Sequence, residues 1–197
     1  DQEAERLYRQ ALQIRKKLLG NEHPDVATSL SSLATSLFSQ GRHQEVERLY
    51  QQALQMRRKL LGNEHPDVAT SLSHLASVKA DQGKYQEAEN LCRQVLQLRM
   101  KQLGSVHPDV AASLINLASI LSNSGKYSEA ERLFRKALQM REMLLDHDHP
   151  DVANALNHLA FVLIRRGKIL TALPFFIKAF NIQENLLRAH ITETRMR

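Results

Sequence analysis

A repeat of 42 residues, the distance from Pro24 to Pro66, is the feature that most constrains how this chain folds. The segment KLLGNEHPDVATSLS occurs at 17–31 and again, unchanged, at 59–73. Prolines and glycines recur with the same period, at Pro24, Pro66, Pro108 and Pro150 and at Gly41, Gly83, Gly125 and Gly167. Such a period is typical of a solenoid, in which one supersecondary unit stacks on the next.

Each unit contains two stretches with the hydrophobic spacing of an amphipathic helix. The first, which we call helix A, places apolar residues at i, i+4, i+7, i+8 and i+11, as in Val26, Leu30, Leu33, Ala34 and Leu37. The second, helix B, follows Gly41 with charged residues between its apolar positions, which are Val46, Leu49, Tyr50, Ala53, Leu54 and Leu61. The sequence therefore predicts an all-α chain of paired helices.

Proline and glycine mark the ends of these helices. Pro24 suits the first helical position, where its missing N–H is not needed, and Asp25 complements the positive end of helix A. Gly41 and Gly62 follow the last periodic residues, where a left-handed cap costs least without a Cβ. Asp146 replaces this glycine in the fourth connection and is one of the few residue types that tolerate the left-handed conformation, so we expect the turn to be kept.

The pattern predicts one helix B followed by four A/B pairs over residues 1–187, and a C-terminal tail over 188–197. Leu7, Tyr8, Ala11 and Leu12 form a core stripe whose helix A is missing, so we expect the chain to be a fragment of a longer protein. Pro174 lies inside the last helix B, predicted over 168–187, where it predicts a bend or a late helix start.

The last predicted helix also has an unusually apolar surface. Leu173 takes the position of Glu47, Glu89 and Glu131, and Ile177 takes that of Arg93 and Arg135. A terminal repeat exposed to solvent should instead be polar. We therefore expect this helix to be covered by downstream chain, by the tail or by a second copy.

The motif HPDVA-x-SL-x-x-LA-x-x-L-x-x-x-GKY-x-EAE-x-L-x-RKAL-x-x-R-x-x-LL, clearest over 107–145, resembles the tetratricopeptide repeats of the kinesin light chain type. Small residues (Ala34, Val46) and bulky residues (Leu33, Tyr50) match the motif over residues 1 to about 187. The resemblance implies a right-handed superhelical solenoid that binds a peptide in a concave groove lined by helices A.

The resemblance also implies which residues contact a peptide. The groove positions are Thr28, Ser31, Ser32, Thr35, Thr70, Ser73, His74, Ser77, Asn116, Ser119, Asn154, Asn157 and His158. Where light chains often carry arginine, this chain has Phe38, Ala80, Ser122 and Ile164, and the lysine and arginine of chaperone-binding repeats are absent. Cations cluster on helices B, as in Arg57-Arg58-Lys59, which predicts a basic convex face and a nearly neutral groove rich in hydroxyl and amide groups.

The remaining chemistry-bearing residues favour no catalytic or metal site. Four histidines precede the prolines, and because each lies one repeat from the next, they are too far apart to converge on a metal. Cys92 takes a core position. There is no GxSxG motif and no phosphate-binding glycine loop, so we expect neither an enzyme nor a cofactor. His74 and His158 differ from the equivalent Ser32 and Asn116, and we interpret them either as pH-sensitive ligand contacts or as drift between repeats.

Charge and composition bound the possible partners. The net charge of +6 would suit nucleic acid or an anionic membrane through helices B, but aromatic residues make up only 5%, which leaves little surface for base stacking. No segment has the length and polarity of a membrane span or of a signal peptide, which predicts a soluble, cytoplasmic protein. The sequence predicts a protein-interaction module of the adaptor or scaffold type. The alternative is a structural spacer or sensor arm that self-associates through its terminal helices.

Overall fold

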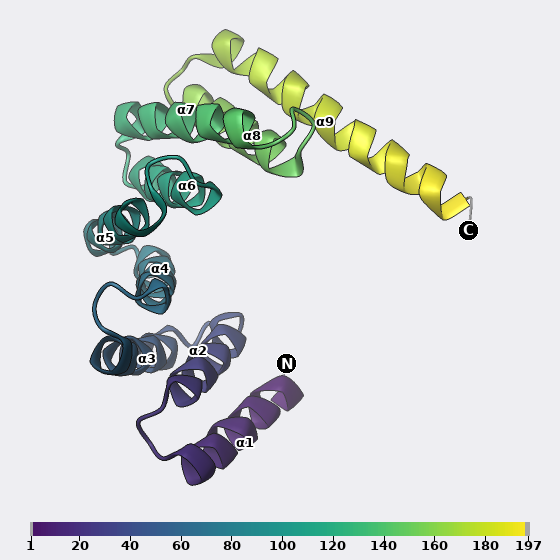
Figure 1. The fold of residues 1–197 in the computed structure, drawn as a ribbon. Coiled ribbons are helices and arrows are strands. Elements are labelled where there is room, and N and C mark those ends of the chain that lie inside the picture. The colour runs from purple at the N-terminus through teal and green to yellow at the C-terminus, as the bar shows by residue number, and fades with distance from the viewer. Residues whose placement is uncertain (1, 196–197) are drawn as a thin grey trace. The chain divides into compact units, whose positions relative to one another are not determined.

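The computed structural model describes residues 2–195, and side chains as far as Arg188. Over this range the chain forms nine α-helices and no strands (Figure 1). The helices are α1 (Gln2–Leu19), α2 (Pro24–Phe38), α3 (His43–Leu61), α4 (Pro66–Asp81), α5 (Tyr85–Leu103), α6 (Pro108–Asn123), α7 (Tyr127–Leu144), α8 (Pro150–Arg165) and α9 (Ile169–Arg195). The predicted all-α repeat fold is confirmed, with α2, α4, α6 and α8 as helices A.

The helices divide into two compact units. The first unit, Asp1–Gln102, contains α1 to α5, and the second, Leu103–Arg197, contains α6 to α9. Helices that follow one another in the sequence pack together from α1 to α4 in the first unit and from α6 to α9 in the second, as in α2 with α3 and α8 with α9 (Figure 1). The predicted helix A stripe of α2 is fully buried, whereas Leu7 and Tyr8 of α1 are exposed, as expected for a helix B without its own helix A.

The helices A start as the proline pattern predicts. Each has its proline in the first turn, and the preceding histidine is its N-cap. The Nδ1 atom of His107 accepts a hydrogen bond from the Asp109 N–H at 3.1 Å, and His23, His65 and His149 cap their helices in the same way. The sequence pattern predicts these histidines in loops, and their capping role is visible only in the structure.

The predicted glycine caps are also confirmed, with one correction at Asp146. Gly62 ends α3 with a φ of 87°, and all seven glycines have positive φ. No other residue of the described chain has a positive φ, so Asp146 does not adopt the left-handed conformation expected of it. Instead α7 ends one residue earlier, and its C-cap Leu145 is extended, with φ −129°. The turn is kept because the His149 N–H bonds the Asp146 carbonyl at 2.9 Å, as His65 bonds Gly62 at 3.4 Å.

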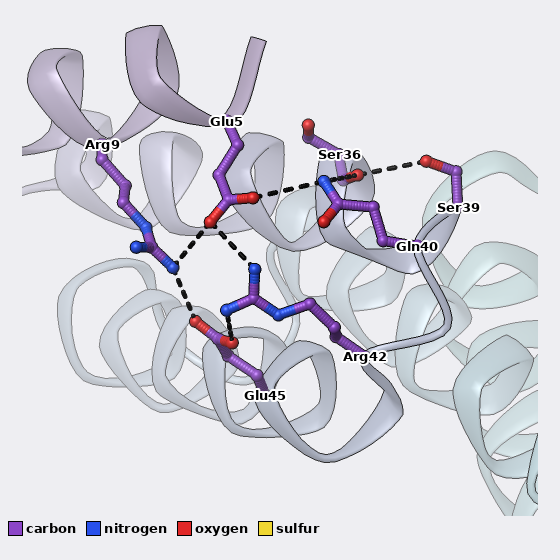
Figure 2. Close-up of polar contacts among 7 residues, drawn as sticks. All are labelled: Glu5, Arg9, Ser36, Ser39, Gln40, Arg42 and Glu45. Carbon is purple, nitrogen blue, oxygen red and sulfur yellow. Dashed lines mark hydrogen bonds and ion pairs between the residues drawn. The ribbon is translucent and has the colours of Figure 1, made fainter. Parts of the chain in front are cut away.

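Within each unit, a glutamate on helix B binds the turn of the next repeat. In Figure 2, the Glu5 carboxylate accepts hydrogen bonds from Arg42 at 2.9 Å and from Gln40 at 3.3 Å, and Arg9 bridges Glu5 and Glu45. The hydrogen bond from Arg42 is the main cause that lowers the pKa of Glu5.

The same contact recurs in later repeats. Glu47 accepts from Lys79 and Gln82, both at 2.9 Å, and Glu131 accepts from Arg166 and Lys168. Burial alone would raise the pKa of Glu47 and of Glu131. The hydrogen bonds from Lys79 and Gln82 to Glu47, and from Arg135 and Arg166 to Glu131, outweigh burial and lower both pKa values. Within each unit, the register between neighbouring repeats is therefore fixed by a partly buried ion pair as well as by apolar packing.

The last helix is longer than predicted. It begins at Ile169 and includes Pro174, so the late helix start is wrong. It continues to Arg195, and the predicted boundary between array and tail at residue 188 therefore lies within a continuous helix. Within the described part of the chain, no helix is both long enough and apolar enough to cross a bilayer.

Candidate functional site

The predicted peptide contacts of the first unit lie along one side of α2 and α4. We call this surface the α2–α4 face, formed by Thr28, Ser31, Ser32, Thr35, Thr70, Ser73, His74 and Ser77. Thr28, Thr35, Thr70 and Ser77 are exposed and most of the others are half-buried. Ser31 is buried, so it is not available as a direct contact.

The predicted contacts of the second unit form the α6–α8 face. They are Asn116 and Ser119 on α6 and Asn154, Asn157 and His158 on α8. Asn116 and Asn154 are exposed, and the other three are half-buried. Within residues 2–188, the amides of Asn116 and Asn157 make no hydrogen bond to another residue, so both can bond a ligand.

Five of the seven hydroxyl groups of the α2–α4 face already use their protons. Thr70 Oγ1 donates to the Pro66 carbonyl at 3.3 Å, and Ser73 Oγ donates to the Ala69 carbonyl at 3.0 Å. Thr28, Thr35 and Ser77 donate in the same way to the carbonyl four residues earlier. A hydroxyl bonded to its own helix keeps lone pairs for a ligand. This face therefore presents mainly acceptors, rather than the mixture of donors and acceptors that the composition predicts.

Arg57 lies behind the α2–α4 face, and the prediction that it belongs to the convex surface is wrong. Only 6% of Arg57 is exposed. Its Nη1 donates to Ser71 Oγ at 2.7 Å and to Ser31 Oγ at 3.4 Å, and its Nη2 donates to Thr28 Oγ1 at 3.5 Å. Burial lowers the pKa of Arg57, although Asp67 opposes this effect. The predicted neutral groove thus has a buried positive charge directly beneath it.

The second unit repeats this arrangement with Arg141. Its Nη1 donates to the Asn154 Oδ1 atom at 3.1 Å, and its Nη2 lies 3.8 Å from the Asp151 carboxylate. In the first unit, Arg15 donates to Ser29 Oγ at 2.9 Å. Arginine in fact occurs at this position in the first four helices B, as Arg15, Arg57, Arg99 and Arg141, and Gln183 takes it in α9. This 42-residue recurrence is the signal that could have separated these arginines from the solvated cations beside them.

The two groove histidines stack on aromatic rings of the preceding helix B. The ring centroids of His74 and Tyr50 lie 4.8 Å apart, and those of His158 and Phe134 lie 5.3 Å apart with nearly parallel planes. Burial and the nearby Arg57 lower the pKa of His74, and burial and Arg141 do the same for His158. The Nδ1 atom of His74 is buried and has no hydrogen-bond partner in the described chain. His74 and His158 thus make the same kind of ring contact, one in each unit.

Other groups that could carry chemistry have structural surroundings. Cys92 is buried, and burial raises the pKa of its thiol to about 11, which disfavours the reactive thiolate. Within the described residues, no three His, Cys, Asp or Glu side chains come close enough together to hold a metal ion.

Comparison with known proteins gives a consistent picture. The family model of the tetratricopeptide repeat matches residues 1–59, 31–84, 67–143 and 109–185. The fold is similar to a crystal structure of the TPR-like repeats of a kinesin light chain protein from Podosopora anserina, with a TM-score of 0.82, 30% identity, and coverage of 95% of this chain and 88% of that one.

More distant structures share the fold. BtubC from P. vanneervenii has a TM-score of 0.82 at 24% identity, with coverage of 94% of this chain and 74% of that chain. The apo form of RapI has a TM-score of 0.77 at 16% identity, with coverage of 94% and 65%. A comparison with curated proteins finds no significant match.

Proposed function

Because this chain belongs to the tetratricopeptide repeat family, we propose that it is a non-enzymatic interaction module that holds an extended segment of another protein on its helix A faces. Repeats of this family generally mediate protein–protein interaction. An adaptor or scaffold role in the cytoplasm is part of the same proposal, and microscopy of the tagged protein would test the location.

The observation that carries the proposal is the set of hydroxyl acceptors above a buried guanidinium. Thr28, Thr35, Thr70 and Ser77 are exposed and have donated their protons to their own helices. An extended peptide presents N–H groups at regular intervals, and these need acceptors when water is removed. Such a face recognises the backbone of a peptide more than its side chains.

The buried arginines add a preference to this backbone recognition. Within the described residues, no carboxylate lies within ion-pair distance of Arg57, whose hydrogen bonds go to hydroxyl groups. A buried charge without a directly paired carboxylate attracts negative groups over a longer distance than a solvated charge does. We expect peptides with carboxylates or exposed carbonyl groups near His74 to bind better than basic ones.

In the second unit, the amides of Asn116 and Asn157 supply the donors that the first face lacks. An amide both donates and accepts, so it can bond one peptide residue through its N–H and C=O groups. We expect Asn116, which is exposed and has no partner in the described chain, to contribute most to this face.

The test uses peptides selected from a random display library against the intact chain, with binding measured by calorimetry. We expect Asn116→Ala and His74→Ala each to weaken a peptide bound at their own face by about tenfold, the equivalent of one hydrogen bond. Asn90→Ala and His147→Ala are matched controls, because both residues are exposed and lie off these faces. Binding that survives both face variants, or a library that yields no peptide, would contradict the proposal.

A further inference from the structure

The last helix has an apolar surface that nothing in the described chain covers. Along one side of α9, five large apolar residues are at least half exposed: Leu170 (87%), Leu173 (54%), Ile177 (51%), Phe180 (63%) and Leu187 (60%). We call them the α9 stripe. On other sides of the same helix, Ala172, Ala179 and Ile182 are buried. A helix that is apolar on more than one face is normally covered on each of them.

The α9 stripe departs from the repeat that produced the rest of the molecule. At the position of Leu173, the four earlier helices B carry Glu5, Glu47, Glu89 and Glu131. At the position of Leu170, these helices carry Gln2, Gln44, Gln86 and Ser128. At the position of Ile177, they carry Arg9, Gln51, Arg93 and Arg135. Three positions that are polar in every earlier repeat are therefore apolar only in α9.

This change makes α9 unsuitable for stacking another repeat of the same kind. Glu47 and Glu131 each bind cationic and polar groups of the following turn, and Leu173 cannot accept those hydrogen bonds. Phe180 takes the position of Leu54 and Leu138. Those two leucines are buried, whereas Phe180 is exposed. The surface that covers α9 must therefore be apolar where an ordinary repeat would present cations.

The spacing of the stripe indicates what that surface is. The stripe residues are spaced alternately three and four positions apart, at 170, 173, 177, 180 and 187. This spacing is the one that brings two helices together as a coiled coil. The one interruption is Glu184, which already pairs with Arg188 at 2.7 Å. We propose that α9 packs against α9 of a second copy of this chain, so that the protein forms a twofold-symmetric dimer.

The charges beside the stripe suit contact with an identical helix. Asn181 and Gln183, which flank the stripe, are neutral, and Lys178 is paired with Glu142 at 2.7 Å. A second copy therefore brings no unpaired like charge against the stripe. Because the same surface is used by both partners, the assembly closes at two copies.

The area of the stripe is sufficient for a weak but specific dimer. Full burial of an aliphatic or aromatic side chain removes roughly 60–120 Å² from water, so the five residues would bury about 300 Å² in each copy. Two copies give about 600 Å² of apolar area, and since interfaces are roughly 60% apolar the total is about 1,000 Å². This is near the lower limit for a specific interface, and it predicts exchange between monomer and dimer.

The exposed residues of α1 do not compete as the partner surface. Leu7 and Tyr8 are of the same types as Leu49 and Tyr50 at the equivalent positions of α3. Leu7 and Tyr8 therefore follow the repeat pattern, unlike the residues of the α9 stripe. Contact between α9 and α1 of another copy would also be head-to-tail, and it would produce chains that grow with concentration.

The test measures the mass of the intact chain by sedimentation velocity from about 1 to about 500 µM, a range that covers weak and moderate dissociation constants. We expect the mass to rise from 22.5 kDa to twice that value and then to stop. The double variant Leu173→Glu with Ile177→Arg gives α9 the residue types found at the equivalent positions of α7. There, Arg135 Nη2 and Glu131 Oε1 form an ion pair at 3.0 Å. We expect it to raise the dissociation constant of the dimer by at least about tenfold while helicity is unchanged.

Met143→Glu is the matched control, because Met143 is as exposed as the stripe residues but lies on α7. We expect it to leave the dimer intact. A wild-type chain that stays at 22.5 kDa throughout, or a dimer that the double variant does not weaken, would overturn the proposal. Growth beyond two copies would also overturn it in favour of head-to-tail contact. None of these results depends on whether the helix A faces bind a peptide.

Discussion

The Arg57 guanidinium donates a 2.7 Å hydrogen bond to the hydroxyl group of Ser71 and lies almost completely buried behind two helices A. Ser71 in turn donates to the Asp67 carbonyl at 2.9 Å. The charge is therefore part of the packing between α3 and α4, as well as a source of positive potential beneath the α2–α4 face.

Replacement of Arg57 should destabilise the first unit. We expect Arg57→Ala to cost about 2–4 kcal/mol, because it removes buried packing and leaves hydroxyl groups without their donor. Arg58→Ala, which changes an exposed neighbour, should cost less than about 0.5 kcal/mol. Urea denaturation followed by circular dichroism measures both, and equal effects of the two variants would show that Arg57 is not buried as described.

The capping histidines allow a test within one loop. His149 caps α8 through Nδ1, whereas His147 is exposed two residues away and caps no helix. We expect His149→Ala to cost about 1 kcal/mol and His149→Ser to recover most of the loss, since serine is a good N-cap. His147→Ala should have no measurable effect on thermal unfolding. A larger effect at residue 147 than at 149 would contradict the capping role.

The stacked histidines predict that stability falls in mild acid. An unfolded histidine takes up a proton near pH 6.5, whereas burial and the adjacent arginine lower the pKa of His74 and of His158 in the native state. Below about pH 6.5 the unfolded chain therefore binds more protons than the folded chain, and the free energy of unfolding decreases as the pH falls.

The residue at the equivalent position in α6, Asn116, provides the control. We expect the double variant His74→Asn with His158→Asn to lose less of its melting temperature between pH 8 and pH 5.5 than the wild type does. An unchanged slope would show that these two histidines are not the groups that titrate. The capping histidines remain in both proteins, so their contribution cancels in the comparison.

The single thiol should react slowly in the native state. With the pKa of Cys92 raised to about 11, the thiolate fraction at pH 8 is roughly a hundredfold below that of an ordinary cysteine. We expect modification by a disulfide reagent to be at least that much slower in the folded chain than in the same chain in denaturant. Similar rates in both states would contradict the burial of Cys92.

The sequence predicted the helices, their starts and their core stripes because the 42-residue period shows each signal several times. It did not predict the burial of Arg57, since a run of three cations resembles a solvated surface when one repeat is considered alone. The histidine caps were missed because imidazole is not among the common N-cap groups. The turn at Asp146 was predicted, but its backbone was not, because the chain can close the same hydrogen bond without a left-handed residue.

The end of the last helix was the least predictable boundary. Neither glycine nor proline follows Leu187, so no residue marks a stop, and α9 continues to Arg195. The predicted contact residues do gather on the helices A of each unit, but their chemistry depends on atoms that a repeat pattern does not show. Hydroxyl protons used within the helix and a guanidinium packed behind it become visible only in three dimensions.

Photo-crosslinking tests the central claim, that partner segments bind on the helix A faces, most directly. A benzophenone amino acid is placed at Asn116 on α6 in one variant and at Gln52, an exposed residue of the helix B α3, in another. Each variant is irradiated with a library-selected peptide that the wild-type chain binds and that Asn157→Ala weakens. We predict a covalent adduct at position 116 and none at 52. An adduct at position 52 with none at 116 would contradict the account.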